Sequence, residues 1–226
     1  MMIDKLYPYR FEIFFVSQIA ILFGSLLIPM DIFQTLLSPI LFLVNLFAGI
    51  VLMSKLKSRH RFFLVLLIMS GVLFAYDLVD ETKNNDLEFF RLAIYFSFYI
   101  FVTYEIVKQV WRSKQINKNT MFGLVSGYVS IGLLGFFLCL TIEMATPDSF
   151  LFTQADLYAE GMKNESLMYF SYITLLSIGY GEIVPISSLA QKATVLIGLI
   201  GQIYLVVITG IVIGKYLNQL PRKEKE

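Results

Sequence analysis

The residues with the clearest chemical potential form one short run, Ser177–Glu182, which reads Ser-Ile-Gly-Tyr-Gly-Glu. Glycine adopts backbone conformations that are closed to other residues, so Gly179 and Gly181 allow successive peptide carbonyls to turn toward one axis. Carbonyl oxygens arranged in this way replace the hydration shell of a dehydrated cation. The Ser177 hydroxyl would add one more oxygen ligand at one end. We therefore expect the backbone oxygens of Ser177–Gly181 to bind cations.

A short apolar stretch, Ser166–Leu176, comes directly before this run and must position it. A helix of about 11 residues rises ~16 Å, which is roughly half of the ~30 Å of hydrocarbon in a bilayer. Because this stretch cannot cross a membrane, we predict a re-entrant helix that enters and returns from one side. Irregular backbone at membrane depth occurs only where it is buried in protein or lines a water-filled path, which agrees with a run of ion-binding carbonyls.

The rest of the chain consists of long apolar segments. Of its 226 residues, 57 % are hydrophobic and 15 % are charged, whereas average soluble proteins carry about 25 % charged residues. This composition excludes a soluble enzyme. A helix needs ~20 apolar residues to cross a bilayer, and the runs of that length are Phe11–Met30, Phe33–Ser54, Phe62–Val79, Phe89–Val110, Met121–Ile142 and Leu189–Leu217. We predict an all-α membrane protein with six transmembrane helices and the re-entrant helix between the fifth and the sixth.

Charged residues between the spans predict the orientation. Basic residues gather at one side of the membrane: Lys5, Arg10, Lys55, Lys57, Arg59, Arg61, Arg112, Lys114, Lys118, Lys215, Arg222, Lys223 and Lys225. The loops of the other side are acidic: Asp31, Asp80, Glu81, Asp86, Glu88, Asp148, Asp156, Glu160 and Glu165. The positive-inside rule then places both termini in the cytoplasm of a multi-pass cell-membrane protein. The acidic loops either serve only to solvate the outer face or attract cations to it.

The run Ser177–Gly181, between a short apolar helix and the last span, resembles the pore of potassium channels, whose filter reads Thr-Val-Gly-Tyr-Gly. The resemblance covers about residues 121–220, and we name Ser177–Gly181 the filter segment. It implies stacked K⁺ sites formed by the carbonyls of Ser177, Ile178, Gly179 and Tyr180. K⁺ is then the permeant ion, and no further cofactor is expected. Ser177 replaces the usual threonine but keeps the hydroxyl, and Ile178 replaces valine but keeps the β-branch, so selectivity should be preserved.

The resemblance also points to residues that support the filter segment. Glu182 stands where the family usually has an aspartate that bonds to an aromatic residue of the pore helix. The matching aromatic positions here are Tyr169 and Phe170 rather than tryptophans, and we expect Tyr169 or Tyr172 to donate a hydrogen bond to Glu182. The alternative is that these aromatics only pack, since Phe and Tyr are abundant throughout the sequence.

Gly201 lies twenty residues after Gly181, within the last span. The resemblance places a gating hinge of the pore-lining helix at this position. Glycines in membrane helices also permit close helix packing, and both interpretations remain open at this stage.

One chain supplies a single carbonyl at each level of the site, whereas a dehydrated K⁺ needs several around the axis. No second Gly-Tyr-Gly occurs in the chain, so four copies must surround the pore. We predict a homotetramer with cyclic symmetry in contact with membrane lipids, and no nucleic-acid partner.

The layout divides into a four-helix domain, 1–118, and a pore domain, 119–226. Six spans with the filter before the last one resemble voltage-gated channels, yet the fourth span carries Arg91 and Lys108 with no base between them. Without a ladder of charges to move across the field, steep voltage opening lacks an energy source, so we expect weak or no voltage dependence. In the second span, Asn45 is expected to bond across helices.

The leading hypothesis is a potassium-selective channel that conducts K⁺ passively. The alternatives are a poorly selective cation channel of the same fold and a non-conducting membrane subunit. An intramembrane enzyme is disfavoured because no Asp, His or Ser groups are paired at catalytic spacing within the spans. Cys139, the only cysteine, is interpreted as a small core residue.

Overall fold

The computed structural model describes residues 5–55, 57–77, 85–153 and 163–219. Several residues used to predict the orientation lie outside these ranges: Asp80, Glu81, Asp156, Glu160, Arg222, Lys223 and Lys225. The main helices are α2 (Arg10–Phe23), α3 (Met30–Ile32), α4 (Ser38–Met53), α5 (Lys57–Asp77), α6 (Asn85–Arg112), α7 (Lys118–Ala145), α8 (Lys163–Leu175), α9 (Ser188–Ile203) and α10 (Thr209–Gln219). Two short strands, β1 (Phe150–Phe152) and β2 (Ile183–Pro185), pair antiparallel.

The prediction of a helical membrane protein is confirmed. In the described part of the chain, six helical segments are long and apolar enough to cross a bilayer: Tyr7–Leu26, Phe33–Met53, His60–Asp77, Asp86–Arg112, Lys118–Ala145 and Ser188–Gln219. Each overlaps one of the predicted spans.

The first segment departs from its predicted end at Met30. Its α-helix ends at Phe23 and continues only as a 3-10 turn to Leu26. Pro29 then has extended backbone, with ψ near 138°, and a proline disfavours helical geometry in the residue before it. Hydropathy alone did not predict this end of the helix, because the residues up to Met30 are mostly apolar.

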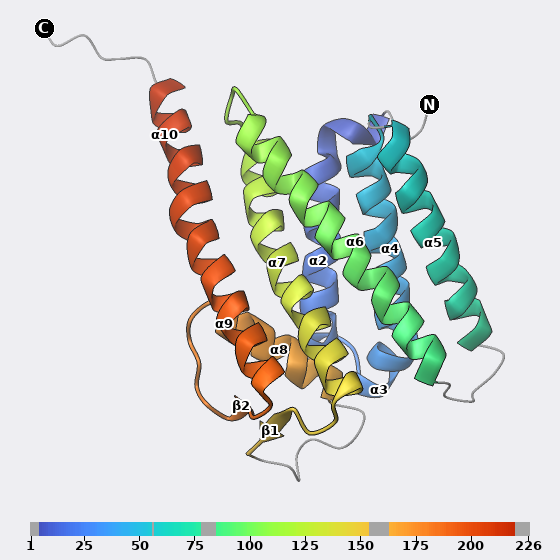
Figure 1. Ribbon diagram of the computed structural model, residues 1–226. Helices are drawn as coiled ribbons and strands as arrows, with labels where there is room; N and C mark the ends of the chain where they lie inside the picture. Colours follow the sequence, from blue (N-terminus) through green and yellow to red (C-terminus); the bar gives the residue numbers. More distant parts are fainter. Residues whose placement is uncertain (1–4, 56, 78–84, 154–162, 220–226) are drawn as a thin grey trace, which may run out of the picture.

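The helices α2, α4, α5 and α6 pack side by side, and α7 lies against both α2 and α6 (Figure 1). Polar side chains link them in the buried interior, as expected for Asn45. Its Nδ2 donates to the Ser17 hydroxyl over 2.8 Å, and its Oδ1 accepts from the Tyr99 hydroxyl over 2.8 Å. Gln18 of α2 donates to the Ser130 hydroxyl of α7 over 2.7 Å. The division of the chain at residue 118 into two domains stays a prediction.

The short helix α8 lies between α7 and α9 at one end of the bundle, close to β1 and β2 (Figure 1). From there α9 leads through a π-helical segment, Tyr204–Ile208, into α10. The start of α2 and the end of α10 lie at the opposite end of the bundle (Figure 1). Cys139 is buried in the core, as predicted.

Candidate functional site

The filter segment begins where α8 ends, and the end of this helix sets the conformation of Ser177. The N–H of Ile178 donates to the carbonyl of Ile173 over 2.8 Å, and the N–H of Ser177 donates to the carbonyl of Thr174 over 3.0 Å. These two bonds form a Schellman motif, which requires a left-handed residue just after the helix. Ser177 occupies that position with φ of 58°. The helix therefore extends from Lys163 to Leu175, close to the predicted Ser166–Leu176.

Left-handed residues recur at every second position of the filter segment. Gly179 has φ of 58° and Gly181 has φ of 92°, while Ile178 and Tyr180 between them do not have positive φ. A Cβ at either glycine would meet no atom within 4 Å, so the backbone angle, not space, is what calls for glycine here.

The carbonyls of the filter segment, residues 177–181, accept no hydrogen bond from any residue that the structure describes. The described residues also hold no cluster of His, Cys, Asp or Glu that suits a metal ion. The peptide oxygens of the filter segment and the Ser177 hydroxyl remain as candidate cation ligands.

Side chains of α8 hold the helix against α7. The Tyr172 hydroxyl donates to the Val129 carbonyl and the Ser171 hydroxyl donates to the Gly132 carbonyl, each over 2.7 Å. A Cβ on Gly132 would overlap the Tyr172 ring, so this glycine makes room for α8. The prediction that Tyr172 donates to Glu182 is therefore wrong, because the Tyr172 hydroxyl donates to Val129 of α7 instead.

Phe170 faces the filter segment from the other side of α8. It is buried and contacts the Phe150 ring of β1, with ring centroids 5.2 Å apart. A cavity of about 400 Å³ lies beside Phe170, lined also by Ile173, Thr174, Ser177, Gly179, Gly181, Ile183, Val184, Pro185 and Thr194. Glu182 lies in sequence between two of the lining residues, Gly181 and Ile183. Its Oε1 is buried without a hydrogen-bond partner among the described residues. Tyr169 is 42 % exposed, and its role as support for the filter segment stays a prediction.

Gly201 lies against the end of α8. A Cβ at this position would be 2.7 Å from the Leu175 carbonyl oxygen, which accepts a hydrogen bond of 3.1 Å from the Tyr128 hydroxyl. The helices α7 and α9 thus meet at Leu175, two residues before Ser177. The structure supports the packing interpretation of Gly201, and its role as a gating hinge stays a prediction.

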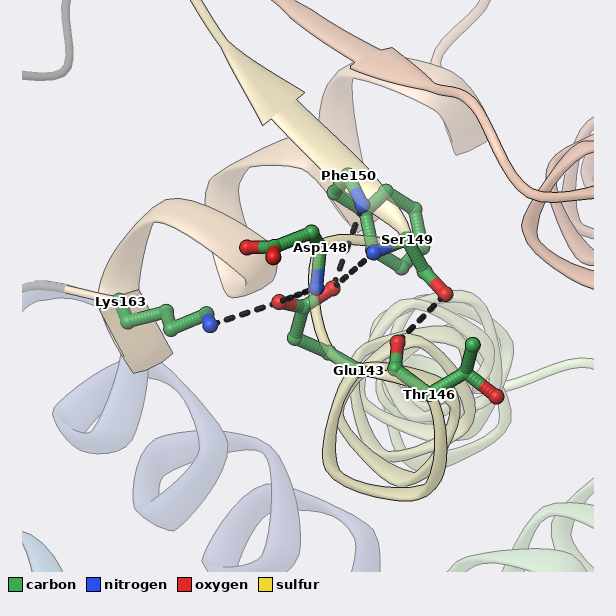
Figure 2. Close-up of polar contacts among 6 residues, drawn as sticks. All are labelled: Glu143, Thr146, Asp148, Ser149, Phe150 and Lys163. Atoms are coloured by element: carbon green, nitrogen blue, oxygen red, sulfur yellow. Dashed lines mark hydrogen bonds and ion pairs between the residues drawn. The ribbon is translucent and has the colours of Figure 1, made fainter.

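A buried carboxylate, which the sequence analysis did not single out, organises the turn after α7 (Figure 2). Glu143 is 4 % exposed. Its carboxylate accepts from the backbone N–H groups of Asp148, Ser149 and Phe150 over 3.1, 2.9 and 3.2 Å. Lys163, the first residue of α8, lies 2.6 Å from the same carboxylate. One side chain therefore ties together the end of α7, the start of β1 and the start of α8.

The turn that Glu143 holds continues to the Gly181 end of the filter segment. Leu151 of β1 lies opposite Val184 of β2. Just beyond β1, the N–H of Thr153 donates to the carbonyl of Glu182 over 3.0 Å, and its hydroxyl donates to the same oxygen. The N–H of Ile186 donates to the Ser149 carbonyl over 2.9 Å. Glu143 thus restrains Glu182 indirectly, through one turn and one strand pair.

The first turn of α8 carries a second acidic residue, Glu165. Partial burial raises the pKa of Glu165 above its ordinary value, and the Gln34 side chain opposes this shift. A negative charge in the first turn is favoured by the helix dipole, but here desolvation is the larger effect.

The sequence holds only weak signals for Glu143 and Gly132, two residues that the sequence analysis did not identify. Glu143 is an acid at the end of a long apolar run, where it needs a partner. Gly132 is one of four glycines in α7, and small residues of membrane helices often permit close packing. Neither signal identifies the contacting residue, because the partner is distant along the chain, as Ser171 is 39 positions from Gly132.

Comparison with known proteins finds similarity in the part of the chain that contains the filter segment. No curated protein and no solved structure matches the sequence. A family model described as "Ion channel" matches residues 144–218, from the turn beside Glu143 through the filter segment to the end of α10. This match supports an ion channel, and it identifies the segment 144–218 as similar to that family.

Proposed function

We propose that the protein is a potassium-selective channel that conducts K⁺ passively across the cell membrane as a homotetramer. The observation that carries this proposal is the filter segment, whose carbonyls accept no hydrogen bond from the described residues. All five residues are exposed in the single chain, and at membrane depth irregular backbone is tolerated only where it is buried in protein or lines a water-filled path. A permeating cation and its water supply partners for these carbonyls.

The backbone angles support a row of carbonyls. Alternation of left-handed and right-handed residues turns successive N–H groups to one side of the chain, and so turns the carbonyls to the other side. Ser177, Gly179 and Gly181 have positive φ, and Ile178 and Tyr180 between them do not, which agrees with such a row. Stacked oxygens of this kind replace the hydration shell of K⁺.

Apolar exposure supports assembly of several copies. Tyr180 is 73 % exposed and Ile178 is 47 % exposed in one chain. The helix Ser188–Gln219 is one of the two least buried of the six long segments, although its mean hydropathy is the highest. Large exposed apolar patches mark protein or membrane contacts. Four copies around one axis would cover part of this surface and complete each level of the site.

The charges of α6 support weak or no voltage dependence. Arg91 forms an ion pair with Asp77 at the end of α5, and Lys108 lies 3.9 Å from Glu105. Both are near the ends of the helix, so few charges would cross the field. Each elementary charge that moves through 100 mV contributes only ~2.3 kcal/mol.

The test is a measurement of the reversal potential. Purified protein is reconstituted in a planar bilayer with K⁺ on one side and Na⁺ on the other, and current is recorded over a range of voltages. We expect a reversal near the K⁺ limit and a current without steep voltage dependence. A reversal near zero would favour a poorly selective cation channel. Absence of current, with a stable tetramer on a sizing column, would favour a non-conducting subunit.

A further inference from the structure

One polar contact joins the filter segment to the pore-lining helix. The Gln202 Nε2 atom donates to the Ser177 hydroxyl over 2.6 Å, and both residues are exposed in the single chain. Gln202 follows Gly201, the residue that lies against the Leu175 carbonyl. The contact therefore sits where the end of α8, the filter segment and α9 meet.

Gln202 is unusual within its own helix. Between Thr194 and Thr209 the only other polar side chain is Tyr204, which is buried and donates to the Leu124 carbonyl of α7 over 2.6 Å. Gln202 instead lies on the exposed side, surrounded in sequence by Gly, Leu, Ile and Val. A polar side chain in a membrane helix normally faces the protein interior or a water-filled cavity, so Gln202 is expected to face the water below the filter segment.

The chemistry of the pair suits a cation. A hydroxyl has one donor and two acceptor lone pairs, and an amide has an acceptor oxygen besides its N–H donors. The bond from Gln202 uses one lone pair of Ser177 and limits the rotation of its side chain. The other lone pair remains, as does the Gln202 carbonyl oxygen. Both are uncharged oxygen ligands of the kind that hard cations prefer.

The end of α8 adds a favourable field. A helix carries roughly −0.5 of a charge at its C-terminus, and Ser177 lies two residues beyond the last residue of this helix. A cation beside the Ser177 hydroxyl would be stabilised by that charge without any ionised side chain.

We propose that Gln202 is a cation-binding residue at the inner end of the filter segment, where its amide orients the Ser177 hydroxyl and adds an oxygen ligand. The site takes a partly hydrated K⁺, or a divalent cation of similar size such as Ba²⁺. The inference rests on the proposed channel function, because four copies of the pair are needed to surround the ion. Gln202 then determines how tightly cations bind from the cytoplasmic side.

The experiment measures block of K⁺ current by Ba²⁺ added to the cytoplasmic side. Gln202→Leu removes both amide groups, and Gln202→Glu replaces the amide with a charged carboxylate of the same shape. We expect the Leu variant to weaken Ba²⁺ block by about tenfold, equivalent to ~1.4 kcal/mol, and the Glu variant to strengthen it by at least as much. A role in packing alone would not give opposite effects. The matched controls are Gln219→Leu and Gln219→Glu at the far end of the same long helix, and these should stay near the wild-type value.

A second measurement separates this inference from the channel proposal. Ba²⁺ that binds the folded tetramer raises its thermal midpoint whether or not the protein conducts. We expect this rise to be smaller in Gln202→Leu and larger in Gln202→Glu. If wild type and all variants carried no current, but Ba²⁺ still changed their thermal midpoints as expected, the channel proposal would be overturned and the cation site supported. Normal K⁺ current with unchanged block and unchanged shifts would overturn the role of Gln202.

Discussion

Lys163 at the start of α8 lies 2.6 Å from Glu143 at the end of α7, and the same carboxylate accepts three backbone N–H groups of the following turn. The side chain of Glu143 is 3 % exposed, whereas that of Lys163 is 41 % exposed. The hydrogen bonds from the backbone N–H groups to Glu143 are thus shielded from solvent, whereas the ion pair with Lys163 is partly exposed to it.

This relationship predicts unequal effects of two substitutions. Glu143→Gln keeps the shape but loses the charge and one acceptor oxygen, so it should lower the stability of the folded protein by about 1–3 kcal/mol. Lys163→Gln should cost less, about 0–1 kcal/mol, because solvated ion pairs contribute little. Thermal unfolding of both variants in the same detergent measures the difference. A larger loss for Lys163→Gln would show that the ion pair, not the backbone bonds, holds the turn.

Gly201→Ala should destabilise the contact between α8 and α9. Its Cβ would be 2.7 Å from the Leu175 carbonyl oxygen, and overpacking of this kind costs roughly 1–3 kcal/mol. The matched control is Gly210→Ala, where a Cβ meets nothing within 4 Å and the better helix former should be neutral or stabilising. Thermal midpoints distinguish the pair. Equal stability of both variants, with changed opening only in Gly201→Ala, would support the hinge instead.

Gly179→Ala tests the left-handed backbone of the filter segment. No neighbour would contact the added methyl group, so the effect must come from φ of 58°, which costs an L-residue about 1–2 kcal/mol. We expect a folded protein with strongly reduced K⁺ flux into liposomes. Gly198→Ala, which also adds a methyl group to open space, is the control. Flux at the wild-type level in Gly179→Ala would contradict the role of this conformation.

Lys215 should couple α10 to the end of α6. Its Nζ donates to the Trp111 carbonyl and, over 3.1 Å, to the Ser113 carbonyl. A cation at a helix C-terminus is favoured by the helix dipole. We expect Lys215→Met to increase amide hydrogen exchange in residues 112–117. Gln219→Leu, which removes a longer bond of 3.4 Å to Lys114, should have a smaller effect, and the reverse order would refute the coupling.

Glu165 predicts a pH dependence of stability. Because burial raises the pKa of Glu165, the folded state favours its protonated form. Its contribution to folding stability is therefore complete below the ordinary pKa and is lost as pH rises through the raised pKa. Glu165→Gln, which cannot ionise, should therefore be more stable than wild type at neutral pH, with the difference disappearing in acid. Thermal midpoints of both proteins over the acid range measure this, and parallel curves would contradict it.

Much of the fold could be predicted because hydropathy depends on local composition. Long apolar runs identify helices without any knowledge of their neighbours, and all six runs correspond to helices in the structure. The short helix α8 was predictable for the same reason, and the Gly-Tyr-Gly spacing located the left-handed positions that follow it. The first helix ended early because Pro29 overrides its apolar surroundings.

The partners of individual side chains could not be predicted in the same way. Tyr172 was expected to donate to Glu182, and it donates to Val129 because Gly132 leaves room for its ring on α7. Gly201 was open to two interpretations, and its contact with Leu175, which supports packing, depends on how α9 meets α8. The contacts of Glu143 and Gln202 join segments whose approach depends on how α7, α8 and α9 pack.

The sequence by itself determined a helical membrane protein and the glycine-containing segment proposed to bind cations, because hydropathy and glycine backbone freedom are properties of the residues themselves. The tertiary structure alone decided which atoms hold that segment at its two ends. Glu143 reaches Lys163, and Gln202 reaches Ser177, only through the packing of helices, since hydrogen bonds require atoms to lie within about 3 Å.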